Sequence, residues 1–126
     1  MLVMETFKEY QEKAVSLGIS LDKFKAMHPE TPDDVLELLA VAYDGLGLGE
    51  AGEVQGKIKK IIRDAGGVIT DEHRDAIKAE LGDTLWYMAS MCKNLGFGLE
   101  DVATYNIEKL IGRHARGTIH GSGDNR

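Results

Sequence analysis

The sequence has few of the features that mark several common protein classes. A single cysteine, Cys92, excludes an intramolecular disulfide framework, and its apolar helical context favours a buried thiol over a nucleophile. No apolar run approaches the roughly 20 residues that span a bilayer, and residues 1–5 lack the basic and apolar regions of a signal peptide. The net charge of −6, without a basic block, argues against nucleic-acid binding. We therefore expect a cytoplasmic protein that binds neither a membrane nor nucleic acid.

Strand-like alternation is also absent, and helical periodicity runs through most of the chain. The 126 residues suit one domain, so we expect a single all-α domain over 1–126, a four-helix-type bundle. The two prolines lie in an irregular connector at 19–32 that includes a short helical turn, and a Gly-rich tail covers 116–126. The main helices are expected at about 6–17, at 32–63 (either continuous or kinked at 45–49), at 71–95, and from 99 or 101 to 114.

Two pairs of acidic residues, Glu50/Glu53 and Glu80/Asp83, stand out because apolar and small residues surround them. Residues three apart share a helix face, so each pair directs two carboxylates the same way. Carboxylates among apolar neighbours are costly unless a cation compensates, and hard oxygen ligands suit Mg²⁺. This chemistry alone leaves a metal site and ordinary surface acids equally open. The adjacent glycines, Gly49, Gly52 and Gly82, suggest a close approach of the two helices.

The acidic pairs belong to a longer pattern that resembles the MazG-like, all-α nucleoside triphosphate pyrophosphohydrolases. The resemblance runs from about 46 to 113 and includes Glu50-Ala51-Gly52-Glu53, Glu80-Leu81-Gly82-Asp83-Thr84-Leu85-Trp86-Tyr87 and Asn106-Ile107-Glu108-Lys109-Leu110-Ile111-Gly112-Arg113. It implies hydrolysis of a ribo- or deoxyribonucleoside triphosphate at the α–β bond, giving a monophosphate and pyrophosphate. It further implies a Mg²⁺ site, with Mn²⁺ able to substitute, whose ligands are Glu50, Glu53, Glu80 and Asp83. Glu50 or Glu53 could instead accept a proton from the attacking water.

The same resemblance implies a set of phosphate-contacting residues. Each basic candidate could instead be an ordinary solvated charge on a helix, and the asparagine could simply lie on the polar face of a helix. Trp86 is expected in the core or at a subunit contact rather than stacked on a base. The substrate-binding candidates are Lys57, Lys60, Asn106, Lys109 and Arg113.

Self-association is expected because the helix at 71–95 is apolar on most faces. Related proteins form dimers or tetramers, often with sites completed by a neighbouring subunit, so the resemblance implies a homotetramer or homodimer. Trp86, Met88 or Met91 would lie near the contact, and the tail either closes over a phosphate or is a disordered terminus.

Two alternatives to an enzyme stay open: a regulatory bundle that binds metal or nucleotide without turnover, and a purely structural helical oligomer.

Overall fold

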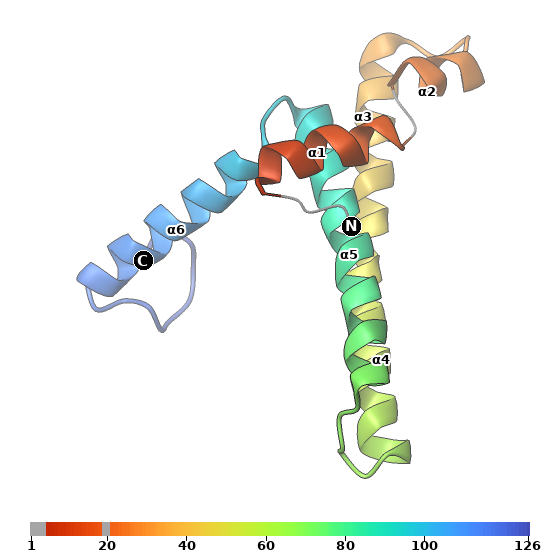
Figure 1. Cartoon of the computed structure of the whole chain (residues 1–126). Helices are drawn as coiled ribbons and strands as arrows, with labels where there is room; N and C mark the ends of the chain where they lie inside the picture. The colour runs from red at the N-terminus through yellow and green to blue at the C-terminus, as the bar shows by residue number, and fades with distance from the viewer. Residues whose placement is uncertain (1–4, 19–20) are drawn as a thin grey trace.

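The computed structural model describes residues 5–18 and 21–126, which form helices joined by turns and loops, without any strand (Figure 1). The all-α class is therefore confirmed for them. The first four residues, on which the expectation about a signal peptide depends, and residues 19–20 at the start of the connector lie outside this description. The helices are α1 (Phe7–Ser16), α2 (Leu21–Met27), α3 (Asp33–Gly47), the 3-10 turn η1 (Leu48–Glu50), α4 (Ala51–Asp64), α5 (Asp71–Leu95) and α6 (Leu99–Ala115).

Side-chain caps and glycines set the helix ends close to where the sequence predicts them. The Thr6 hydroxyl accepts a hydrogen bond from the Glu9 backbone N–H at 3.1 Å and starts α1. At the start of α5, Thr70 Oγ1 accepts from the His73 N–H at 3.2 Å, and His73 Nδ1 accepts from the Thr70 N–H at 3.1 Å. Gly96 ends α5 with a φ of 85°, a left-handed conformation that suits glycine.

The predicted long second helix is a rod of three segments, α3, η1 and α4, that runs antiparallel to α5 (Figure 1). The change from α-helix to 3-10 turn falls at Leu48–Glu50, within and just after the stretch where a kink was considered. All three segments pack on α5. Because the rod and α5 are joined only by residues 65–70, their middle portions must face each other.

A small core joins α1, α5 and α6. It contains Ala14, Ala89, Cys92 and Leu99, and burial raises the pKa of the Cys92 thiol, as expected for a structural cysteine. Gln11 locks this junction: its Nε2 donates to the carbonyls of Ala89 and Phe97, both at 3.2 Å, and its Oε1 accepts from the Leu99 N–H.

Trp86 packs within the chain. Its indole Nε1 donates to the Ala14 carbonyl at 3.2 Å, and its ring lies against Gly18 so closely that a Cβ there would be 2.9 Å away. This supports the core role over base stacking. Met88 is also partly buried against the core, and the Met91 methyl lies near Gly45, so these three residues already have neighbours within one chain.

The close helix approach occurs at a different glycine from those expected. A Cβ at Gly47 would lie 2.2 Å from the Tyr87 ring, so α3 and α5 touch there. Added Cβ atoms at Gly49, Gly52 and Gly82 would meet nothing within 4 Å, so the prediction that these glycines admit the neighbouring helix is wrong for the single chain. They instead leave open surface beside the acidic residues.

The last helix, α6, projects away from the rod and α5 (Figure 1). It packs on α1 and α5, and residues 116–126 fold back along it. Among the described residues α6 does not close a bundle with the rod, so the expected four-helix-type bundle of one domain is not confirmed. No helix in the described ranges combines the length and apolar character needed to cross a membrane.

Candidate metal centre

Three carboxylates from the rod and α5 converge, and we call Glu50, Glu80 and Asp83 the acidic triad. One carboxylate oxygen from each lies within 4.8 Å of the other two. Glu80 and Asp83 are one turn apart on α5, and Glu50 reaches them from the end of η1 because the rod runs antiparallel to α5. Glu50 and Glu80 are half-buried, whereas Asp83 is exposed.

The triad is short of positive charge. Lys57 Nζ lies 3.7 Å from Glu80 Oε1, and within residues 5–18 and 21–126 this is the one ion pair that a triad carboxylate makes. The negative field reaches nearby phenols: the pKa of Tyr87 is raised by burial first, then by Tyr43, and then by Glu50 and Asp83. The pKa of Tyr10 is likewise raised by burial and then by Asp83. A bound cation would relieve this excess charge.

The donor set fits a hard divalent cation. It consists only of carboxylate oxygens, held by two packed helical segments, and contains no sulfur or nitrogen. Mg²⁺ prefers oxygen ligands and keeps part of its water shell, so the three carboxylates would hold it while leaving it open to water or substrate. Mn²⁺ accepts the same donors.

Glu53, the fourth predicted ligand, lies outside the triad. It is exposed in the first turn of α4, about one turn after Glu50. The structure thus brings three of the four predicted carboxylates together and leaves Glu53 beside them.

Lys57, the lysine paired with Glu80, lines a pocket of about 360 Å³ whose wall is partly apolar, with Ile61, Ala65 and Ala76. Lys60 and His73 also line it, together with Asp64, whose carboxylate is held by Arg63 at 2.7 and 2.8 Å. Because His73 Nδ1 accepts from the Thr70 N–H, the neutral ring carries its hydrogen on Nε2 and can donate one further hydrogen bond. The pocket brings the candidates Lys57 and Lys60 together and also contains His73, which the sequence analysis did not name as a candidate.

The α6 candidates lie elsewhere in the single chain. Asn106 is exposed, and both basic residues engage the C-terminal tail: Lys109 Nζ is 3.6 Å and Arg113 Nη2 is 3.3 Å from Asp124 Oδ1. Because α6 projects away from the rod, one chain does not bring these three residues to its own triad (Figure 1).

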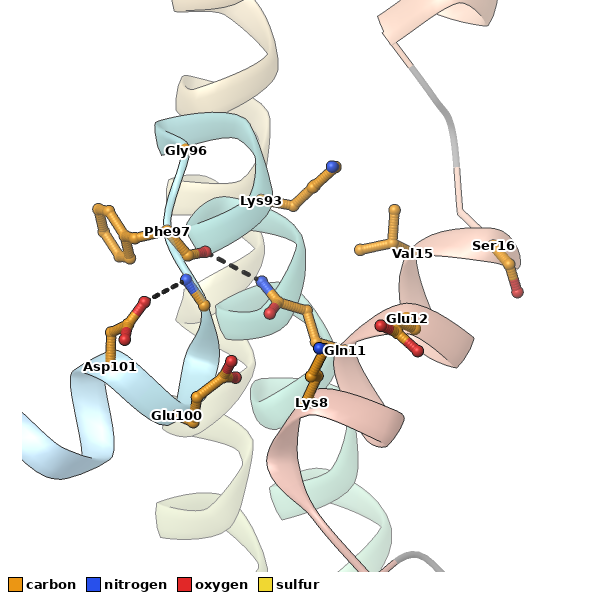
Figure 2. A pocket seen from close by; sticks show the side chains of 11 residues that line it. Lys8, Gln11, Glu12, Val15, Ser16, Lys93, Gly96, Phe97, Glu100 and Asp101 are labelled. Carbon is orange, nitrogen blue, oxygen red and sulfur yellow. Dashed lines mark hydrogen bonds between the residues drawn. The ribbon is translucent and has the colours of Figure 1, made fainter.

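A larger cavity of about 630 Å³ lies between α1 and the α5–α6 turn (Figure 2). Figure 2 shows Gln11 reaching across from α1 to Phe97, with acidic and basic side chains around it. No member of the triad lines this cavity. The convergence of charge, rather than cavity size, therefore makes the acidic triad the candidate metal centre.

Comparison with known proteins identifies the family. The model of the MazG nucleotide pyrophosphohydrolase domain matches residues 46–118, more than half of the chain. The chain belongs to this family. The matched range contains the acidic triad, both pocket lysines and the α6 candidates. A relative, the Gene 37 protein of Mycobacterium phage L5, is 49% identical over 102 residues, which cover 80% of this chain and 89% of that protein. No solved structure matches the chain.

Proposed function

We propose that this MazG-family protein is a Mg²⁺-dependent pyrophosphohydrolase of ribo- or deoxyribonucleoside triphosphates. The reaction would yield a nucleoside monophosphate and pyrophosphate, and it could serve to clear nucleotides from the pool. The observation that carries the proposal is the convergence of Glu50, Glu80 and Asp83 near a pocket that Lys57 and Lys60 line. The triad suits a metal, and the pocket suits the phosphates of the same substrate.

The proposed reaction breaks one phosphoanhydride bond. Water attacks the α-phosphorus, the bond from this atom to the α–β bridging oxygen breaks, and pyrophosphate leaves with the bonding electron pair. The proton of the water passes to a carboxylate. Bound Mg²⁺ would supply neutralisation of the phosphate charge and a more acidic water.

The residues divide between these tasks. Glu50, Glu80 and Asp83 would hold the metal, while Glu53 would either add a fourth ligand or accept the proton. Lys57, Lys60 and His73 line the pocket that would take phosphate oxygens. At 3.7 Å the ion pair between Lys57 and Glu80 is long and therefore weak. Lys57 would thus be able to turn from Glu80 toward a phosphate oxygen when Glu80 holds a metal.

Assembly would supply the remaining contacts. We propose a homotetramer or homodimer in which α6 of one chain brings Asn106, Lys109 and Arg113 to the triad of another. The exposed apolar residues of α6 support such a contact, because burying apolar surface against another chain is favourable. They include Tyr105, Ile107 and Ile111.

The test is a panel of ribo- and deoxyribonucleoside triphosphates, incubated with Mg²⁺ and analysed for each phosphate product. The proposal requires monophosphate and pyrophosphate in equal amounts. Predominant orthophosphate with a nucleoside diphosphate would refute the proposed bond cleavage. Metal-dependent nucleotide binding without turnover of any member would instead support the regulatory bundle. Glu9→Gln, an exposed acid on α1, serves as the control that keeps full activity.

A further inference from the structure

The C-terminal tail, residues 117–126, forms a closed loop against α6. Arg126 fastens the loop to itself: its Nε donates to the Thr118 carbonyl and its Nη2 to the Ile119 carbonyl, both at 3.1 Å, and its Nη1 donates to Gly123 O. Gly117 and Gly123 adopt φ values of 69° and 84°, in the left-handed region that favours glycine. The tail is therefore a built loop rather than a trailing end.

The loop places Asp124 on the two cationic groups of α6. Arg113 Nη2 donates to the Asp124 carbonyl at 3.0 Å and to its Oδ1 at 3.3 Å, and also to the Gly123 carbonyl at 3.3 Å. Lys109 Nζ lies 3.6 Å from the same Oδ1. The two cations, Lys109 first, lower the pKa of Asp124, so its carboxylate is charged at neutral pH.

The tail satisfies Arg113 poorly. The Arg113 side chain is only 7% exposed, and its Nε is buried without an acceptor among the described residues. All three tail acceptors share Nη2, which carries two hydrogens, while the Nε hydrogen has none. The Nε–Nη2 edge of a guanidinium matches two oxygens of one phosphate, so a phosphate would fit this edge better than the tail does.

We propose that Lys109 and Arg113 form an oxyanion site and that Asp124 is its built-in occupant, which a polyphosphate displaces. The tail would then act as an internal competitor: the site stays closed until a ligand with several phosphate oxygens opens it. That this ligand is the triphosphate of a nucleotide rests on the proposed function. The competition itself does not, because it needs neither the metal nor the triad.

Binding of inorganic tripolyphosphate to the full chain tests the competition, and EDTA keeps the acidic triad out of the measurement. Asp124→Asn, which removes the charge and keeps the two tail carbonyls, should raise the affinity measured by calorimetry, by at most about tenfold if the tail is open in a tenth of the molecules. Glu108→Gln makes the same charge change at an exposed position of α6 and should have a much smaller effect. An equal gain in both variants would show a general charge effect and overturn the proposal.

Hydrogen exchange gives a second readout on the same samples. Tripolyphosphate should speed amide exchange in residues 118–126 of the wild-type chain, because the displaced loop loses its hydrogen bonds. Lys109→Gln should weaken tripolyphosphate binding. Slower exchange with ligand, together with weaker binding by Asp124→Asn, would mean that the tail helps to hold the phosphate, and the competitor would be refuted.

The two proposals fail in different ways. Absence of pyrophosphate release from every nucleotide would refute the proposed function and leave the tripolyphosphate results standing. Unchanged tripolyphosphate affinity in Asp124→Asn would refute the tail competitor, whatever the hydrolysis assay shows.

Discussion

Replacement of Asp83 by asparagine tests the acidic triad directly. The change keeps the side-chain shape and removes one of three crowded charges. Without metal the variant should therefore be more stable than the wild-type protein, because like charges repel across the triad. With Mg²⁺ the order should reverse, because the wild-type protein gains a ligand that the variant has lost.

The size of the apo effect follows from the geometry. At 4.8 Å two unit charges repel by about 0.9 kcal/mol in a water-like dielectric and by about 3.5 kcal/mol at an effective dielectric of 20. Asp83 is exposed, so the lower value applies to each of its two repulsions. The variant should gain about 1–2 kcal/mol, which corresponds to a rise in Tm of about 4–8 °C for a chain of this size.

Thermal melts in EDTA and in Mg²⁺, at one protein concentration, measure both effects. Mg²⁺ at a hundred times its Kd should stabilise the wild-type protein by about 2.7 kcal/mol and should have little effect on the variant. The apo difference should shrink in 1 M KCl, where the screening length falls to about 3 Å. Asp75→Asn, in the same helix and paired with Lys78 at 3.8 Å, should change neither melt appreciably.

Glu80→Gln provides an internal comparison, because Glu80 also pairs with Lys57 at 3.7 Å. Its removal loses that attraction together with the two repulsions, so its apo gain should be smaller than that of Asp83→Asn. A lower apo Tm for Asp83→Asn, or an undiminished Mg²⁺ effect in that variant, would refute the metal centre.

Four further predictions concern activity, packing and assembly. Glu53→Gln should abolish turnover, and calorimetry then assigns its role: unchanged Mg²⁺ affinity means a proton acceptor, and weaker affinity means a ligand. Lys60→Gln should raise KM with little change in kcat, because a pocket cation binds the ground state and the transition state alike; an unaltered KM would remove Lys60 from the site. Gly52→Ala should raise the free energy of unfolding of the monomeric fold in urea by up to about 1 kcal/mol, because alanine favours the helix and its Cβ has open space. Gly47→Ala should lower the free energy of unfolding by about 1–3 kcal/mol, because its Cβ would collide with the Tyr87 ring. Similar effects of the two substitutions would contradict the packing described. Light scattering should return the mass of a dimer or tetramer, and an active monomer at micromolar concentration would refute the homo-oligomer.

Local signals account for what the sequence could predict. Helix ends depend on residues close in the chain, such as the Thr70 hydroxyl and the Gly96 backbone, so they could be read directly. The sequence also sufficed to predict that Glu50 and Glu80 lie on facing helices. It follows from helical spacing and a short turn between two long helices, which together force an antiparallel pair.

Tertiary arrangement decided what the sequence could not show. Gly47 and Gly52 look alike in sequence, but only Gly47 lies opposite a Tyr87 ring. The capping role of His73 could have been anticipated from its place three residues after Thr70. Its place in a pocket with Lys60 depends on how α4 packs on α5, which no local pattern records.

The direction of α6 joins two features of the molecule that otherwise have separate explanations. Within this 17-residue helix only Leu99 and Arg113 are buried, although most of the stability of a helix in a protein comes from packing its apolar face. The rod has a similar surplus of apolar surface, with Leu46 81% exposed close to the triad. A neighbouring chain laid against these faces would cover both. The same contact would bring basic residues of α6 toward carboxylates that are short of positive charge, so the apolar surplus and the divided site would have one common cause.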